Sequence, residues 1–198
     1  PRRQRLRQPL PLLVLLDVSG SMERYVRLLL AFLHAATAPG SGAGSGAGRR
    51  DVFAFGTALT DLTPAFASQD PDAMLARAGA AIADYAGGTR LAASLAQLRT
   101  QHARRLVGRR TLVLLVSDGL ATDEPAALAQ ELAWLRRHSA RLLWLNPLLR
   151  FAAYAPVARG AAELHRAADA MLAVHNLQSL QQLAASLAEV LRAPPRQR

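Results

Sequence analysis

LLDVSGSMERY, Leu15 to Tyr25, is an apolar run that ends abruptly in an acid and two serines. The run starts earlier, and residues 10–17 (LPLLVLLD) form the continuous apolar stretch that is typical of a strand buried on both faces of a parallel sheet. The polar side chains of Asp17, Ser19 and Ser21 then alternate along a loop that leads into a helix, and we expect a locally extended backbone that aims all three to one side. This stretch therefore predicts a central strand with a polar cluster at its carboxyl end.

A second stretch repeats the pattern, because RTLVLLVSDG (110–119) is an apolar strand that ends in Ser, Asp and Gly. Strand-like and helical segments alternate along the rest of the chain. We predict helices at 23–37, 70–86, 91–106, 124–138, 157–167 and 177–191, further strands at 141–146 and 170–174, and a hairpin at 51–66. Asp70 and Pro71 have the types expected at the cap and first position of a helix. This order predicts an α/β fold with a mostly parallel sheet, helices on both faces and the hairpin at one edge.

The length of 198 residues and the 51% apolar content suit one folded domain. We expect it to span residues 10–192, with a basic extension at 1–9, a flexible Gly/Ser/Ala loop at 39–48 and a tail at 193–198. The chain has no cysteine, which excludes disulfides, thiolate metal sites and cysteine catalysis. No apolar run reaches the roughly 18 residues of a membrane span, so we expect a cytoplasmic location. A start at Pro1 also fits a piece of a longer protein.

The formal net charge is +10, and all 24 basic residues are arginines. They cluster at Arg2, Arg3, Arg5 and Arg7, at Arg99, Arg104, Arg105, Arg109 and Arg110, and at Arg136, Arg137 and Arg141. Such clusters fit nucleic acid or an acidic protein surface, and equally fit solvated helix ends. The aromatic residues, 5% of the chain, are not interleaved with the arginines, so a stacking platform for single strands is unsupported.

The polar residues after the two strands predict a metal site. Loops at the carboxyl ends of neighbouring parallel strands meet, so the cluster at Asp17, Ser19 and Ser21 should lie beside Asp118. Thr89, after two glycines, can add a third hydroxyl. Carboxylate and hydroxyl oxygens suit magnesium or calcium, and no histidine or cysteine is at hand to favour zinc. Two carboxylates neutralise one divalent cation and leave it able to accept a carboxylate from another molecule.

Other interpretations remain open for the same residues. Ser19 or Ser21 can cap the following helix, Asp118 with Gly119 is a common turn pair, and Gly20 permits the turn into the helix. A phosphatase of the haloacid dehalogenase type also starts with a strand that ends in aspartate. That chemistry wants a second acid where this chain has Ser19, and the chain has no lysine to place over a phosphoryl group. No GxSxG or GxxxxGK[ST] is present, which argues against a serine hydrolase and against ATP hydrolysis by this chain.

These motifs resemble a known family. DVSGSM (17–22) matches the DxSxS signature of the metal-ion-dependent adhesion site (MIDAS) of von Willebrand factor A (VWA) domains, and GGT (87–89) and SDG (117–119) match its later loops in order. VFAFGT, WLNPLL, YAPVARG and HNLQSL extend the similarity to the CoxE-like branch, from about Leu10 to Leu191. The Gly/Ser/Ala loop departs from that pattern.

The resemblance implies a Rossmann-like VWA fold with a six-stranded sheet and a non-enzymatic adaptor. It implies that Ser19, Ser21 and Thr89 offer hydroxyls to a divalent cation, Mg²⁺ first and Mn²⁺ or Ca²⁺ as alternatives. Asp17 and Asp118 would act directly or through water. An acidic residue of the partner would bind the cation. The implied partners are a MoxR-type AAA+ ATPase and a client molybdenum enzyme such as carbon monoxide dehydrogenase, whose maturation the adaptor would serve. Arg90 would attract an acidic partner, although a solvated loop arginine is the alternative.

Overall fold

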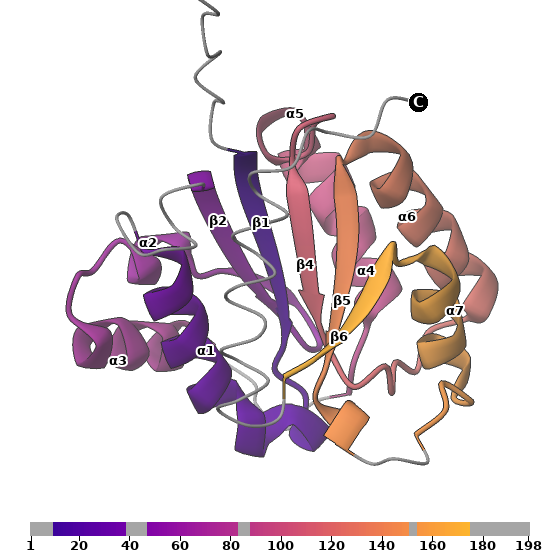
Figure 1. Ribbon diagram of the computed structural model, residues 1–198, viewed down its shortest axis with the longest axis horizontal. Helices are drawn as coiled ribbons and strands as arrows, with labels where there is room; N and C mark the ends of the chain where they lie inside the picture. The colour runs from indigo at the N-terminus through magenta and orange to yellow at the C-terminus, as the bar shows by residue number, and fades with distance from the viewer. Residues whose placement is uncertain (1–9, 39–46, 83–87, 151–153, 175–198) are drawn as a thin grey trace, which may run out of the picture.

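A computed structural model describes residues 10–38, 47–82, 88–150 and 154–174 and contains one six-stranded sheet (Figure 1). The strand order is β3-β2-β1-β4-β5-β6, and every neighbouring pair is parallel except β2 with β3. The strands are β1 (Leu10–Asp17), β2 (Ala47–Phe55), β3 (Leu59–Asp61), β4 (Leu112–Val116), β5 (Arg141–Asn146) and β6 (Ala170–Ala173). The predicted α/β class and antiparallel edge strand are confirmed.

The apolar runs of β1 and β4 are explained by their central position. The two strands pair in register, with Val14 opposite Leu114, and β2 lies on the other side of β1. Both strands thus have neighbours on each side, helices cover both of their faces, and nearly all of their side chains are buried. Continuous Leu and Val suit this environment because a doubly covered strand has no solvent-facing side.

Helices cover both faces of the sheet, as predicted (Figure 1). On one face α1 (Glu23–Thr37), α2 (Thr63–Phe66) and α3 (Pro71–Ala81) pack against side chains such as Val14 and Leu16. On the other face α4 (Leu91–Gln97), α6 (Pro125–His138) and α7 (Arg159–Ala167) pack against Leu13 and Leu15. The alternating side chains of β1 thus divide between two cores. Asp70 caps α3 by accepting a hydrogen bond from the Asp72 N–H at 3.0 Å.

Several predicted boundaries differ from the structure. The hairpin at 51–66 is shorter, because residues 63–66 form α2, and β2 begins at Ala47 within the predicted loop. The helix at 91–106 is a continuous helical stretch in which a π-helical turn, η3 (Leu98–His102), separates α4 from α5 (Ala103–Leu106). The helix at 70–86 ends at Ala81 as α3. The predicted helix at 177–191, residues 39–46 of the loop, the extension at 1–9 and the tail at 193–198 lie outside the described residues.

None of the helices in the described ranges combines the length and the apolar character that crossing a bilayer requires.

Candidate metal centre

The carboxyl ends of β1 and β4 bring the two polar loops together at the lower edge of the sheet in Figure 1. Leu16 pairs with Val116, so Asp17 and Ser117 leave adjacent strands at the same level. A direct hydrogen bond joins them, because Ser117 Oγ donates to Asp17 Oδ2 at 2.7 Å. The predicted meeting of the two loops is therefore present in the structure.

Asp17 is the most enclosed residue of the predicted set, with 0% of its surface exposed. Its Oδ1 accepts a hydrogen bond from the Ser19 N–H at 2.9 Å, while Oδ2 accepts from Ser117. Burial raises the pKa of Asp17 above its ordinary value; the hydrogen bonds from Ser19 and Ser117 lower that pKa, and the nearby charge of Asp118 raises it further. A neighbouring cation would therefore stabilise the ionised form of this buried carboxylate.

Ser19 and Ser21 lie side by side, with 3.3 Å between their hydroxyl oxygens. We expected an extended backbone through both serines, but only Ser19 is extended, and a 3-10 turn, η1 (Gly20–Met22), brings Ser21 back beside it. Neither serine donates or accepts a side-chain cap bond at η1 or α1, so the helix-cap interpretation is wrong. Gly20 has no positive φ, and a Cβ added there would meet open space, so the turn does not require glycine at this position.

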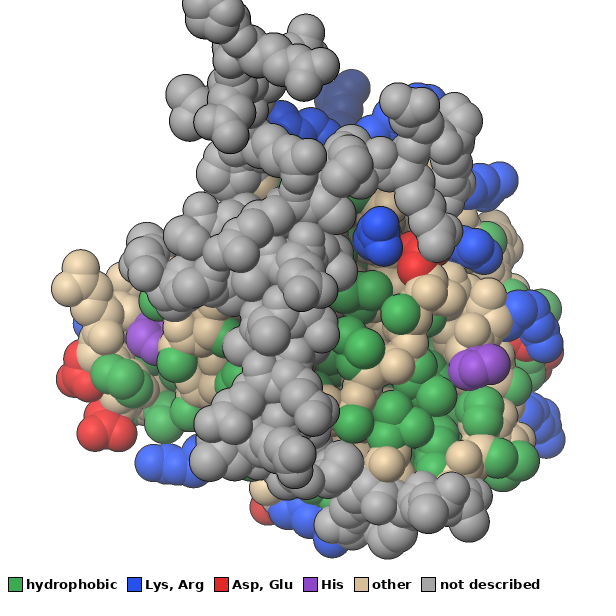
Figure 2. Space-filling model, viewed as in Figure 1, with side chains coloured by type: hydrophobic (Ala, Val, Ile, Leu, Met, Phe, Trp, Pro, Cys, Tyr) green, Lys and Arg blue, Asp and Glu red, His purple; other side chains and the backbone are tan. Residues whose placement is uncertain are grey.

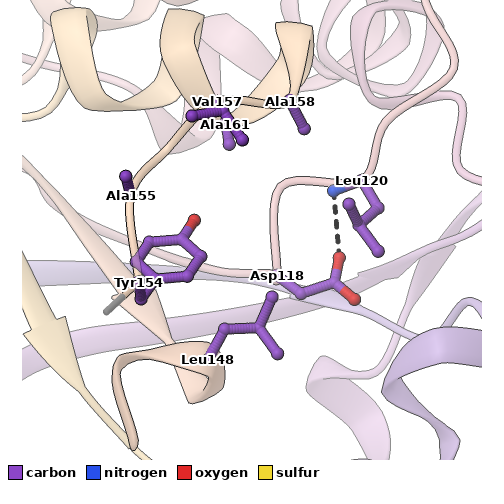
Figure 3. A pocket seen from close by; sticks show the side chains of 8 residues that line it. All are labelled: Asp118, Leu120, Leu148, Tyr154, Ala155, Val157, Ala158 and Ala161. Carbon is purple, nitrogen blue, oxygen red and sulfur yellow. Dashed lines mark hydrogen bonds between the residues drawn. The ribbon is translucent and has the colours of Figure 1, made fainter. Parts of the chain in front are cut away.

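Asp118 is 2% exposed and begins a tight turn. Its Oδ1 accepts a hydrogen bond from the Leu120 N–H at 3.0 Å (Figure 3). Gly119 has a φ of 81°, and a Cβ there would lie 2.8 Å from the Ala161 Cβ on α7. Gly160 packs equally closely, since its Cβ would lie 2.7 Å from the Gly119 carbonyl oxygen. The turn interpretation of Asp118 and Gly119 is therefore correct, and the turn fixes the carboxylate beside the end of β1.

Thr89 is 3% exposed and is held by its backbone. Its carbonyl accepts hydrogen bonds from the N–H of Thr122 at 3.2 Å and from Thr122 Oγ1 at 3.0 Å. The next residue, Arg90, donates its N–H to the Gly56 carbonyl after β2. These contacts tie Thr89 to the loop that carries Asp118. Among the described residues, no hydrogen bond joins the Thr89 side chain to the other four predicted side chains.

Three further side chains, whose roles were not predicted from the sequence, support the site. Ser117, noted only as part of SDG, also accepts the Gly119 N–H at 3.0 Å and so links the turn to Asp17. Trp144 is fully buried, and its indole N–H donates to the Ser117 carbonyl at 2.8 Å. Asn146 Nδ2 donates to the Tyr154 hydroxyl at 2.8 Å. An unexplained polar residue at the end of a buried strand, such as Asn146, is the signal that could have indicated such a role.

The donor set fits a hard divalent cation. Asp17 and Asp118 are both buried, and among the described residues no arginine or histidine forms an ion pair with either carboxylate. Buried charges in proteins are paired with an opposite charge or coordinate a metal. The described residues contain no cluster of three or more His, Cys, Asp and Glu side chains, so the oxygen donors here are two carboxylates and nearby hydroxyls.

Comparison with known families gives a match over most of the chain. A family model described as VWA domain containing CoxE-like protein matches residues 1–180. No curated protein matches the chain.

Solved structures share the fold at low sequence identity. Proximal thread matrix protein 1 of the mussel byssus superposes with a TM-score of 0.62 at 14% identity, over 92% of this chain and 48% of that one. A von Willebrand factor type A protein of Catenulispora acidiphila superposes with a TM-score of 0.59 at 18% identity, over 93% of this chain and 42% of that one. Another structure of the mussel protein, with a zinc-occupied MIDAS motif, has a TM-score of 0.52 at 14% identity, over 92% of this chain and 48% of that one. The chain spans less than half the length of these three solved chains.

Proposed function

Because the chain belongs to the family of VWA domain containing CoxE-like proteins, we propose that it is a metal-dependent protein-binding module. VWA domains are generally interaction modules without catalytic activity. In this chain Asp17, Ser19, Ser21, Thr89 and Asp118 would hold a divalent cation. The partner would supply an acidic side chain to that cation.

One observation carries the proposal: two carboxylates are buried next to each other, and no cationic side chain of the described residues pairs with either. Asp17 and Asp118 are 0% and 2% exposed, and the negative charge of Asp118 contributes to the raised pKa of Asp17. Such a pair is unfavourable unless a cation lies between or beside the two groups. The hydroxyls of Ser19 and Ser21 lie at the same strand end and are not used as helix caps.

The chemistry of the donors favours Mg²⁺, with Mn²⁺ and Ca²⁺ as alternatives. Carboxylate and hydroxyl oxygens are hard ligands, and Mg²⁺ keeps several positions for water or an incoming ligand. A bound cation would accept a carboxylate oxygen of another protein. The protein side chains would hold the cation, and Asp17 and Asp118 would neutralise its charge. We therefore expect binding and no turnover, and steady hydrolysis of a phosphate ester or nucleotide by the purified domain would contradict this.

The test is Mg²⁺-dependent binding of a carboxylate ligand. Titration of the domain with acetylated glutamate amide, followed by NMR shifts, should show binding with Mg²⁺ and none with EDTA. The Asp17→Ala variant should stay folded by circular dichroism and lose this binding. Asp70→Ala removes an acid that only caps α3, so it serves as the matched control and should bind like the wild type. Retention of full Mg²⁺-dependent binding in Asp17→Ala would overturn the proposal.

We propose further that the module acts in the cytoplasm between a MoxR-type AAA+ ATPase and a client molybdenum enzyme such as carbon monoxide dehydrogenase. The support is the family alone. Co-purification of the ATPase with the wild-type domain in Mg²⁺, and its loss in EDTA or in Asp17→Ala, would support this role. Co-purification that persists both in EDTA and in Asp17→Ala would contradict it.

The structure gives the nucleic-acid alternative little support. Three arginines of the predicted clusters face acids: Arg99 pairs with Glu131 at 2.8 Å, Arg105 lies 3.9 Å from Asp51, and Arg136 lies 3.9 Å from Asp169. Among the described residues visible in Figure 2, most basic side chains lie scattered near the outline of this face and do not form one stripe. Strong salt dependence of DNA affinity that is unchanged in Asp17→Ala would favour the alternative.

A further inference from the structure

A pocket of about 390 Å³ opens directly beside Asp118 (Figure 3). Its lining includes Asp118, Leu120, Leu148, Tyr154, Val157 and Ala161. Asp118 is the only acid among the described residues of the lining, and most of the other lining side chains are aliphatic. The pocket and the candidate metal centre therefore share one carboxylate, so a ligand at the metal would have this cavity next to it.

The walls of the pocket expose large apolar side chains. Leu120 is 48% exposed and Val157 is 88% exposed, and the only other large hydrophobic residue this exposed in the described part of the chain is Leu28 on α1. Two of these three side chains thus belong to one pocket. Exposed apolar side chains gathered at a concave site, in contrast to scattered ones, are typical of a binding surface.

The pocket walls are held in place by the same contacts that hold Asp118. The Leu120 N–H bonds to Asp118 Oδ1, and Gly119 packs against Ala161 of α7. On the opposite wall the Val157 N–H donates to the Ala155 carbonyl at 2.8 Å, and Asn146 bonds the Tyr154 hydroxyl. A pocket whose walls are fixed in this way requires little ordering when a ligand enters.

The charge around the pocket favours an acidic segment. Arg159 is exposed and follows Ala158 of the pocket wall, and the exposed Arg90 follows Thr89 of the candidate metal centre. A bound cation beside Asp118 would add positive charge next to the pocket. A peptide with an acid and a neighbouring apolar residue would match both the charge and the shape of the site.

We propose that this pocket binds an apolar side chain that neighbours the metal-coordinating acid in the partner's sequence. The pocket thus sets specificity, since it distinguishes an acid flanked by leucine-like residues from an isolated acid. This inference rests on the proposed function, because the metal-bound acid places the apolar side chain at the pocket.

Three tripeptide amides test the inference: Ac-Leu-Glu-Leu-NH₂, Ac-Gly-Glu-Gly-NH₂ and Ac-Leu-Gln-Leu-NH₂. Each is titrated into the ¹⁵N-labelled domain with Mg²⁺ and again with EDTA. Leucine on both sides of the acid covers either direction of the bound chain. The wild type should bind the Leu-Glu-Leu peptide about tenfold more tightly than the Gly-Glu-Gly peptide, as expected for partial burial of one leucine side chain.

Variants locate the effect. Leu120→Ser and Val157→Ser should reduce the tenfold preference to about twofold or less and leave Gly-Glu-Gly binding unchanged. Leu28→Ser is the matched control, since Leu28 is as exposed as Leu120 but lies on α1 outside the pocket, and it should keep the full preference.

Failure of the inference differs from failure of the proposed function. Equal affinity of the two glutamate peptides, with Mg²⁺ dependence intact, would overturn the inference about the pocket alone. The same holds if Leu28→Ser loses as much of the preference for the Leu-Glu-Leu peptide as Leu120→Ser does. Equal affinity of the glutamate and glutamine peptides with leucine flanks, in Mg²⁺ and in EDTA, would overturn the proposed function and the inference with it.

Discussion

Ser117 Oγ donates a 2.7 Å hydrogen bond to Asp17 Oδ2 across 100 positions of the chain. Both residues are fully buried, and Ser117 also accepts the Gly119 N–H. One hydroxyl thus orients the carboxylate at the end of β1 and holds the turn that carries Asp118. The two carboxylates of the candidate site depend on the same serine.

Ser117→Ala should weaken Mg²⁺ binding about tenfold or more, because loss of a side chain that orients a metal ligand typically has that effect. The domain should also lose about 1–3 kcal/mol of unfolding free energy, since two buried partners lose their hydrogen bond. Calorimetric titration with Mg²⁺ and urea denaturation measure the two effects.

Ser94→Ala is the control for Ser117→Ala. Ser94 is also buried, but its hydroxyl has no hydrogen-bond partner among the described residues, so its replacement should leave Mg²⁺ affinity unchanged and should not lower the free energy of unfolding. Wild-type Mg²⁺ affinity in Ser117→Ala would show that the link between the two loops has no role in the site.

Ser21→Ala should abolish Mg²⁺ binding with a change in stability of less than about 0.5 kcal/mol, because Ser21 is exposed and caps no helix. Asp70→Ala should do the reverse and cost about 1 kcal/mol through the lost cap of α3 while Mg²⁺ binding persists. Urea denaturation and Mg²⁺ titration of both variants give the comparison. A large stability loss in Ser21→Ala would revive the helix-cap interpretation.

Gly119→Ala should destabilise the domain by at least about 2 kcal/mol, because φ is 81° and the new Cβ would meet Ala161. Gly160→Ala should also lower the free energy of unfolding, because the new Cβ would clash with the Gly119 carbonyl oxygen. Gly20→Ala, in open space, should change stability by only a few tenths of a kcal/mol. Equal effects in all three variants by thermal denaturation would contradict the close packing of α7 against the Asp118 turn.

Saturating Mg²⁺, at about 100 times its Kd, should raise the melting temperature of the wild type by about 5–10 °C, and EDTA should reverse the rise. The reason is that the cation relieves the buried pair Asp17 and Asp118 only in the folded state. Differential scanning calorimetry of the wild type and Ser21→Ala makes the comparison. An equal rise in both would place the stabilising cation elsewhere.

Much of the fold could be predicted because its signals are local. The continuous apolar runs of β1 and β4 reflect burial on both faces, and Asp70 with Pro71 marks the start of α3. The polar residues at the ends of the two runs could be assigned to one site, because parallel neighbours end at the same edge. The family resemblance, which the match over residues 1–180 confirms, strengthened the prediction that Thr89 belongs to this group.

Other features could not be predicted because they depend on contacts between distant segments. The role of Ser117 requires the register of β1 against β4, which no local pattern reveals. The pocket requires the Asp118 turn to pack against α7, a contact that Gly119 and Gly160 permit through the absence of a Cβ. The backbone path from Ser19 to Ser21 was predicted as extended, because alternation alone does not distinguish an extended loop from a 3-10 turn.

The most direct test of the proposed metal site is an anomalous difference map from crystals of the domain grown with Mn²⁺. We expect one strong peak within coordination distance of the Ser19 and Ser21 hydroxyls, with Thr89, Asp17 and Asp118 around it, and no such peak in crystals of Asp17→Ala. A map of the wild type with saturating Mn²⁺ and no peak among these five residues would contradict the proposed site.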